Sequence, residues 1–306
     1  SSTRRLSSRA IPRSTKTGAI VVIQQPVAVV TGAGGLIGSY LIRTAARYAQ
    51  TWRVCGLTRK DLELTDRAAV QQTWRALQPQ LVIHCAALSK PQQCQTDPRL
   101  ARILNVDVTA RLAELARDIP LIYLSSDLVF DGREGGYEET AAVNPITVYA
   151  ETKVSAERMV LANPHHTVVR TSLNGGVSPT GDRAFNEEMR RAWQDGRCLT
   201  LFTDEFRCPI PAVVTARAVW ELAAKHQPGL YHVAGTERLS RWQIGQLLAA
   251  RWPHLHPRME PGSIRDFSGL PRQPDVSLNC EKVQRLLSFP LPGFAAWLAA
   301  HPDEPF

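Results

Sequence analysis

The sequence lacks a hydrophobic segment long enough to cross a membrane. A membrane-spanning helix needs about 20 consecutive apolar residues, whereas apolar runs here, such as Val27–Val30, have only the length of a strand. The sequence therefore predicts no membrane partner. Its 306 residues, 44% hydrophobic and 21% charged, are typical of a globular protein with one large or two modest domains.

Cysteines are few, and no two of them form a Cys-x-x-Cys pair. The six are scattered, and several lie in apolar runs: Cys55, Cys85, Cys94, Cys198, Cys208 and Cys280. This spacing favours reduced, mostly buried thiols over a disulfide framework or a zinc site. We therefore expect no metal and a cytoplasmic location.

The first 18 residues contain no acidic residue. They carry five of the eight net positive charges of the chain, on Arg4, Arg5, Arg9, Arg13 and Lys16. Because this segment has no periodic apolar face, we expect it to be flexible. It resembles either a leader unrelated to the folded domain or an organelle transit peptide. No aromatic residues lie between the charges, which disfavours a nucleic-acid partner.

Beyond this segment, short apolar runs alternate with amphipathic stretches. The runs predict strands over residues 27–31, 53–57, 81–87, 121–126, 167–172 and 229–235. Between them we expect helices, including one long helical stretch from about Pro98 to Arg117, one capped by Thr65 or Asp66, and a late one capped by Ser240. This alternation predicts an α/β fold with a doubly wound parallel sheet of the Rossmann type.

The regular and less regular parts of the chain predict two lobes. Residues 19–172 and 213–235 are expected to form an NAD(P)-binding domain, and residues 173–212 and 236–306 a small substrate lobe. The histidines of the loop-like regions show no spacing suited to a metal.

A glycine motif lies between the first regular strand and its helix. Gly32, Gly35 and Gly38 have Gly-x-x-Gly-x-x-Gly spacing, and Leu36 and Ile37 open the helix between them. Glycines allow a sharp turn and the close approach of a pyrophosphate to the helix N-terminus. The motif predicts a dinucleotide site, the alternative being an ordinary glycine-rich turn.

The residues after the second strand favour NADP(H). An acid at this position would bind the ribose 2′-hydroxyl of NAD, but the sequence has Thr58, Arg59 and Lys60 there. Cations at this position suit a 2′-phosphate. Asp61 leaves NAD(H) as an alternative cofactor. The same sequence would also be found if Arg59 and Lys60 were only solvated charges of a loop.

A tyrosine and a lysine four residues apart follow the fourth strand. Tyr149 and Lys153 would share one face of a helix, and Ser126 ends the strand before them. Carbonyl reduction needs a proton donor, which a phenol beside an ammonium can be, and the Ser126 hydroxyl can bind the developing alkoxide. Asn105 on the preceding helix could order a water for proton relay or line the cofactor.

These motifs, in this order, resemble an extended short-chain dehydrogenase/reductase. The segments LTRKDLELTD, SSDLVFDGREGGYEE, NPITVYAETKVSAE and DVSLNCEKVQRLL are similar to the dTDP-4-dehydrorhamnose reductase family over about residues 27–290. The resemblance implies catalytic roles for Ser126, Tyr149 and Lys153. It also implies that the cofactor is lined by Glu63, Leu64, Ala86, Ala87, Leu88 and Ser89.

Two positions depart from the family pattern where the sugar would lie. Leu128 replaces a tyrosine after Asp127, and Leu173 replaces a tryptophan. The loop containing Arg207 approaches the substrate in that family, so Arg207 could bind a diphosphate or could be an ordinary surface arginine. We take Ser126, Asp127, Leu128, Leu173 and Arg207 as candidate substrate residues.

The resemblance implies an NADP(H)-dependent reductase of a nucleotide-linked 4-keto-6-deoxy sugar, working as a homodimer. Alternatives on the same scaffold are a sugar epimerase, a reductase of a smaller carbonyl, or a non-catalytic regulatory subunit that binds NADP. The regulatory subunit is included because that of methionine adenosyltransferase is similar to this family.

Overall fold

A six-stranded parallel sheet forms the centre of the protein. The computed structural model describes residues 11–14, 20–23 and 25–306. The sheet has the strand order β12-β7-β6-β5-β3-β4. In chain order its strands are β3 (Val27–Thr31), β4 (Arg53–Leu57), β5 (Leu81–His84), β6 (Leu121–Ser126), β7 (Thr167–Thr171) and β12 (Gly229–Val233). The doubly wound parallel fold expected from the sequence is confirmed.

Three strands end earlier than the apolar pattern predicted. β3, β4 and β6 have the expected bounds, but β5, β7 and β12 lose one to three residues at their carboxyl ends. After β5 the chain turns aside beneath the glycine motif, where the Ala86 backbone packs against Gly32. The apolar residues in this region therefore line a loop at the edge of the sheet and do not extend the strand.

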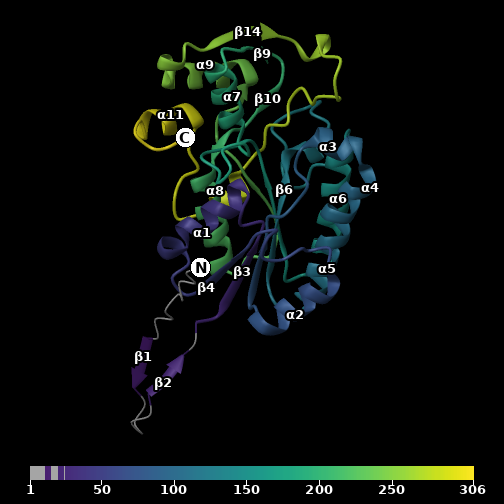
Figure 1. Cartoon of the computed structure of the whole chain (residues 1–306), viewed down its shortest axis with the longest axis vertical. Coiled ribbons are helices and arrows are strands. Elements are labelled where there is room, and N and C mark those ends of the chain that lie inside the picture. The colour runs from purple at the N-terminus through teal and green to yellow at the C-terminus, as the bar shows by residue number, and fades with distance from the viewer. Residues whose placement is uncertain (1–10, 15–19, 24) are drawn as a thin grey trace.

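Helices cover both faces of the sheet. α1 (Leu36–Tyr48) and α8 (Ala212–Ala224) pack together on one face, and α2 (Arg67–Leu77), α5 (Val108–Leu115) and α6 (Val148–Leu161) lie on the other (Figure 1). Asp66 caps α2 by accepting a hydrogen bond from the Ala69 amide. Of the two caps that the sequence allowed, the structure therefore selects Asp66.

The long helical stretch predicted before β6 is interrupted. It consists of α4 (Pro98–Arg102), a π-helical turn at Ile103–Asp107 and α5, and a further short helix, α3 (Pro91–Thr96), precedes it. Asp97 caps α4, and Pro98 opens it. The π-helical turn carries Asn105 into the protein interior. Such turns often occur at functional sites.

The small lobe lies beyond the carboxyl ends of the sheet. It contains α7 (Phe185–Gln194), α9 (Arg241–Arg251) and α11 (Phe294–Ala300), which pack through an aromatic core that includes Phe185, Trp193 and Phe294. Ser240 caps α9, as expected. The strands of this region form short pairs: β8 (Asn174–Gly175) with β11 (Ile210–Pro211), β9 (Cys198–Phe202) with β14 (Arg258–Gly262), and β10 (Phe206–Arg207) with β13 (Leu239–Ser240).

The helix α10 (Glu281–Gln284) belongs with the large domain by its packing. Val283 of this helix joins the core formed by α1, α8 and the sheet, and so does Leu291 after it. The sequence assigned this stretch to the small lobe because it follows the last strand. In space, the chain returns to the sheet before it forms α11.

A separate antiparallel pair, β1 (Ile11–Ser14) and β2 (Ile20–Ile23), precedes the sheet. β1 lies within the segment for which the sequence predicted flexibility. The rest of that segment is outside the described residues, so the flexibility of residues 1–18 stays a prediction. β2 pairs with β1 and does not extend the central sheet.

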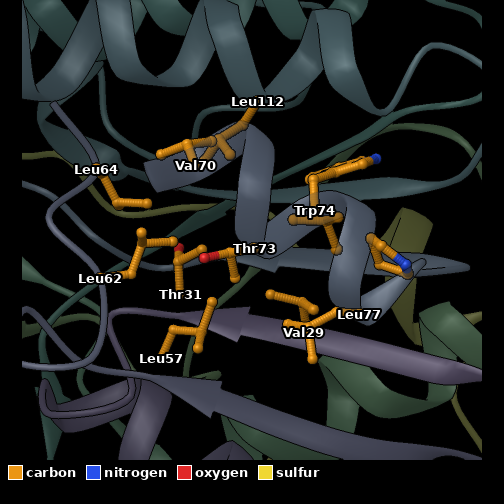
Figure 2. Close-up of a pocket in the computed structure, with 12 residues that line it drawn as sticks. Val29, Thr31, Leu57, Leu62, Leu64, Val70, Thr73, Trp74, Leu77 and Leu112 are labelled. Carbon is orange, nitrogen blue, oxygen red and sulfur yellow. The ribbon is translucent and has the colours of Figure 1, made fainter. Parts of the chain in front are cut away.

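A small cavity lies between α2 and the sheet. Its volume is about 20 Å³, and apolar side chains such as Val29, Leu64, Val70 and Trp74 form most of its wall (Figure 2). A cavity of this size holds at most one water molecule. α2 therefore leaves a small gap against the sheet at Trp74, whereas Trp220 of α8 is fully buried.

Replacing Trp220 with alanine should destabilise the protein strongly. Its ring is buried, and its indole N–H donates to the Leu41 carbonyl of α1 at 3.1 Å. We expect Trp220→Ala to lower the free energy of unfolding by about 3–5 kcal/mol in urea denaturation. Trp74→Ala, at the half-buried edge of the cavity, is the matched control and should cost less. An equal loss in the free energy of unfolding for Trp220→Ala and Trp74→Ala would contradict the difference in packing described for these two tryptophans.

Candidate active site at the carboxyl edge of the sheet

The glycine motif forms a tight turn between β3 and α1. Gly32 has a φ of +70°, and a Cβ atom there would lie 2.6 Å from the Ala86 nitrogen. A side chain at Gly38 would collide with the Gly32 carbonyl. Gly35 precedes α1 without a capping side chain, and the first turn of α1 has no acid. The amides of this helix end can therefore bind an anion.

The loop after β4 presents a cation to solvent. The Arg59 guanidinium is 86% exposed and contacts Glu63, with Nε 3.0 Å from Oε2. Asp61 instead accepts hydrogen bonds from the Thr58 amide and hydroxyl, which lower the pKa of its carboxyl. Asp61 is thus engaged within its own loop, and Arg59 has room to meet a ligand.

Asn105 fixes the loop after β5. Its Oδ1 accepts from the Leu88 amide at 2.7 Å, and its Nδ2 donates to the Leu88 carbonyl at 3.1 Å and to Thr152 Oγ1 at 3.0 Å. The sequence suggested that Asn105 orders a water or lines the cofactor. In the structure its amide holds Leu88, and with it the Ala86–Ser89 stretch, against α6.

Ser126, Tyr149 and Lys153 come together where β6 ends and α6 begins. All three are buried, and Tyr149 and Lys153 lie one turn apart on α6. The Lys153 ammonium lies 6.0 Å from the centre of the Tyr149 ring. Ser126 Oγ donates to Asp127 Oδ1 at 3.1 Å and accepts from the Leu128 amide.

Backbone and side-chain oxygens of β6 hold the Lys153 ammonium. Nζ donates to the Leu124 carbonyl at 2.7 Å and to the Tyr123 hydroxyl at 2.9 Å. Burial lowers the pKa of Lys153 to about 8, while the nearby Glu157 carboxylate acts in the opposite direction. Sequence reasoning missed Tyr123. Side chains alternate between the two faces of β6, so Tyr123 and Ser125 face α6 together, and this pattern could have identified Tyr123.

The tyrosine does not show the lowered pKa that sequence reasoning attributed to its lysine neighbour. Burial raises the pKa of the Tyr149 phenol well above its ordinary value, and the Ser126 hydroxyl opposes this only in part. The phenol is therefore protonated at neutral pH and suited to donate a proton. The expected lowering was wrong for the ligand-free protein, because the burial of a charged phenolate outweighs the other contributions.

Asp127 and Arg207 form a buried, two-pronged ion pair. Arg207 Nε lies 2.7 Å from Asp127 Oδ2, and Arg207 NH2 lies 2.5 Å from Oδ1. The Ser172 hydroxyl also donates to Asp127 Oδ2 at 2.6 Å. With an exposure of 7%, Arg207 is not a surface arginine, so that interpretation was wrong. The pair connects the turn that follows β6 of the large domain to β10 of the small lobe.

The two leucines that depart from the family pattern have different surroundings. Leu128 is half-buried and packs in the same apolar cluster as Tyr149 and Leu88. Leu173 packs against the aromatic core of the small lobe. Leu128 thus belongs to the wall around Tyr149, whereas Leu173 supports the lobe.

Two further arginines of the small lobe were not predicted from the sequence. Arg272 NH1 lies 2.8 Å from Glu205 Oε2, and Arg241 Nε lies 3.8 Å from Glu205 Oε1. In the described part of the chain, Arg241 NH1 and Arg272 Nε are buried without a hydrogen-bond partner. Arg241 also opens α9, where the helix dipole disfavours a cation. That placement against the dipole was a signal available in the sequence.

The described residues contain neither a candidate metal site nor a candidate membrane-spanning helix. Residues 11–14, 20–23 and 25–306 contain no cluster of three His, Cys, Asp or Glu side chains arranged to hold a metal ion. Over the same residues, no helix combines the length and apolarity that a membrane span requires.

The chain is similar in sequence to known proteins whose names indicate two kinds of function. Methionine adenosyltransferase 2 subunit beta of Xenopus laevis is 28% identical over an alignment of 291 residues, and the alignment covers 88% of this chain and 86% of that one. A probable low-salt glycan biosynthesis reductase, Agl14 of Haloferax volcanii, is 31% identical over 235 residues, covering 72% and 78% of the two chains.

The fold also matches solved structures. The dTDP-4-dehydrorhamnose reductase of Bacillus anthracis, solved in complex with NADP, superposes with a TM-score of 0.82 at 23% identity, over 90% of this chain and 98% of that one. The model of the RmlD substrate binding domain matches residues 27–304. This match spans the sheet and the small lobe together, and the chain therefore belongs to the RmlD substrate binding domain family.

Proposed function

We propose that this protein is an NADP(H)-dependent reductase of a nucleotide-linked 4-keto-6-deoxy sugar, of the dTDP-4-dehydrorhamnose reductase type. The observation that carries the proposal is the buried group of Ser126, Tyr149 and Lys153 beside the glycine turn. A protonated phenol, an ammonium and a hydroxyl at one edge of the sheet are the groups that carbonyl reduction needs.

Two features of the structure support a nicotinamide dinucleotide phosphate as the proposed cofactor. The uncapped end of α1 suits the pyrophosphate, and the exposed Arg59 suits a 2′-phosphate. Glu63 and Leu64 are assigned to the adenine side, and Leu88 and its neighbours to the nicotinamide side. Lys153 would hold the nicotinamide ribose. NAD(H) is the alternative cofactor, although the B. anthracis enzyme was solved with NADP.

In the proposed reaction the protein handles the proton. The bound nicotinamide supplies the hydride to the carbonyl carbon. The Tyr149 hydroxyl gives its proton to the carbonyl oxygen, and the Ser126 hydroxyl donates a hydrogen bond to the same oxygen as charge develops on it. Lys153 stabilises the phenolate that remains, which then regains a proton from water.

The arginines of the small lobe support an anionic substrate. The free N–H groups of Arg241 and Arg272 can bind phosphate oxygens, because the carboxylate of Glu205 alone does not satisfy them. The charge of Arg207 is already paired with the Asp127 carboxylate. We therefore move the proposed diphosphate contact from Arg207 to Arg241 and Arg272, and assign Arg207 to holding Asp127 beside Ser126.

A second candidate function is that of a non-catalytic subunit that binds NADP. The name of the X. laevis relative favours it. So does Leu128, which offers no hydroxyl or aromatic face to a sugar beside Tyr149. A sugar epimerase on this scaffold would instead retain its cofactor tightly through purification. A homodimer stays a prediction for each of these functions.

The Tyr149 hydroxyl should be essential for turnover and dispensable for cofactor binding. With dTDP-4-keto-6-deoxy-L-mannose as substrate, Tyr149→Phe should slow NADPH oxidation about 10²–10⁴-fold, because the proton donor is lost. Its Kd for NADPH should stay within about twofold of wild type, since Lys153 is unchanged.

Tyr231→Phe, on β12, removes a hydroxyl that donates to the Pro228 carbonyl just before that strand, and serves as the control with normal turnover. Full activity in Tyr149→Phe would refute the proposed proton donor. Wild-type protein that binds NADPH but oxidises none with this substrate or related sugar nucleotides would favour the regulatory subunit.

Cofactor affinity should fall at alkaline pH. Lys153 has a pKa of about 8 without ligand, and a phosphate-bearing ligand raises it in the complex. NADPH affinity should therefore be constant below about pH 8 and weaken above it, by up to about tenfold per pH unit. Fluorescence titration between about pH 6.5 and 10 measures this. Lys153→Met should bind more weakly with no step near pH 8, and a flat wild-type profile would contradict the assignment.

Arg59 should select NADPH over NADH. Loss of a charge-assisted hydrogen bond to the 2′-phosphate costs about 1.5–3 kcal/mol, so Arg59→Leu should raise the Kd for NADPH at least about tenfold. The Kd for NADH should not change. Arg75→Leu, an exposed arginine on α2, is the control. An equal effect of Arg59→Leu on both cofactors would reject this selectivity.

A further inference from the structure

Glu157 continues the row formed by Tyr149 and Lys153. The three residues lie at successive turns of α6, four positions apart, and all three are buried. The proposed reaction gives Glu157 no task. A buried carboxylate is costly unless it is paired and hydrogen-bonded, so its place beside the site requires an explanation.

The Glu157 carboxylate is fully engaged by two neighbouring strands. Arg170 of β7 donates through Nε to Oε1 at 3.0 Å and through NH2 to Oε2 at 2.7 Å. Ser125 of β6 donates its hydroxyl to Oε1 at 2.5 Å. Ser125 and Arg170 are paired in the sheet register. Glu157 therefore joins α6 to both strands at one point.

Arg170 is itself held on its far side. Its NH1 lies 3.4 Å from His232 Nε2, and His232 Nδ1 lies 3.0 Å from the Tyr137 carbonyl. Burial, together with the Arg170 charge, lowers the pKa of His232 to about 3, so this imidazole is neutral. A neutral ring that donates from Nδ1 to Tyr137 has a free lone pair on Nε2 for Arg170. The ion pair is thus fixed in orientation.

Two successive residues of β6 are held by two successive turns of α6. Leu124 accepts from Lys153, and Ser125 donates to Glu157. Ser126 follows directly at the strand end. The charge of Glu157 also acts on the Lys153 ammonium, which burial otherwise disfavours.

We propose that Glu157 is a positioning residue for Lys153: fixed by Arg170 and Ser125, it keeps the lysine side chain charged and correctly placed at the end of β6. Its relevance to cofactor binding rests on the proposed function, but its effect on Lys153 can be measured without any cofactor.

Several other groups face Lys153 and can also influence the pKa of its ammonium. They are Tyr123 of β6, Tyr149 of α6, His84 at the end of β5, Cys85 after it and Cys94 of α3. His84 has a pKa lowered to about 3, mainly by burial, and is neutral. Burial raises the pKa of Cys85 to about 12, and it also raises the pKa of Cys94, so both are neutral thiols near pH 8. Glu157 is therefore the negative charge of this group at that pH.

The test is the titration midpoint of Lys153 in the free protein. Trace acetylation between about pH 6 and 11, read by mass spectrometry of the peptide containing Lys153, gives this midpoint. Glu157→Gln should lower it by about one pH unit or more, because an opposite charge is removed. Glu157→Asp keeps the charge and should leave the midpoint near the wild-type value.

A matched control distinguishes the proposed effect of Glu157 on Lys153 from a purely structural role of Glu157. Glu221→Gln removes a carboxylate of α8, on the opposite face of the sheet, that accepts from Ser288 and Arg217. It should lower the Tm without moving the Lys153 midpoint. If Glu157→Gln does not fold because Arg170 is left unpaired, the double variant Glu157→Gln/Arg170→Gln avoids the lone buried charge and should show the same downward direction.

An unchanged Lys153 midpoint in Glu157→Gln would overturn the proposal, and so would an equal shift in Glu221→Gln. NADPH titration of the same variants adds a second readout, in which the alkaline loss of affinity should begin at lower pH in Glu157→Gln. If the wild-type protein binds no NADPH at any pH, the proposed function fails, while the acetylation result still decides the role of Glu157.

Discussion

Burying the Lys153 ammonium requires oxygen atoms around it, and β6 supplies them. The Leu124 carbonyl and the Tyr123 hydroxyl receive its hydrogen bonds, so the lysine binds the strand as well as facing the site. A buried charge without such partners would be lost to deprotonation. The start of α6, the end of β6 and the placement of Tyr149 therefore depend on one another. This dependence explains why the loop between them can be long while the site stays fixed.

Two buried ion pairs flank this centre and have different effects. Glu157 and Arg170 lie within the large domain and connect α6 to the sheet. Asp127 and Arg207 connect the large domain to the small lobe. Buried pairs contribute little net stability compared with apolar packing, but breaking one is costly. Their value here lies in geometry, since each fixes the direction of groups next to Ser126.

The sequence predicted the sheet well because a buried parallel strand is a continuous apolar run. Val27–Thr31 and Leu121–Ser126 show this, since their bounds agree with the structure. The glycine turn was equally readable, because the positive φ of Gly32 favours glycine and a Cβ atom there would collide with the Ala86 backbone. Partners far apart in sequence were not readable. The pairing of Asp127 with Arg207, the role of Asn105 at Leu88 and the contact of Tyr123 with Lys153 all depend on tertiary approach. The tyrosine pKa was misjudged because burial cannot be read from a motif.

The π-helical turn at Ile103–Asp107 limits how far the length of this segment of the chain can change. A π-helical turn holds one more residue than an α-helical turn, and Asn105 reaches Leu88 and Thr152 from within it. Deleting a single residue between Pro98 and Leu115 would either convert this turn into a regular α-helical turn or rotate the helical segment on one side of the deletion by about 100° relative to the other. Asn105 would then turn away from the loop after β5. In this segment, variation by substitution is constrained only at particular positions, whereas variation in length is constrained throughout.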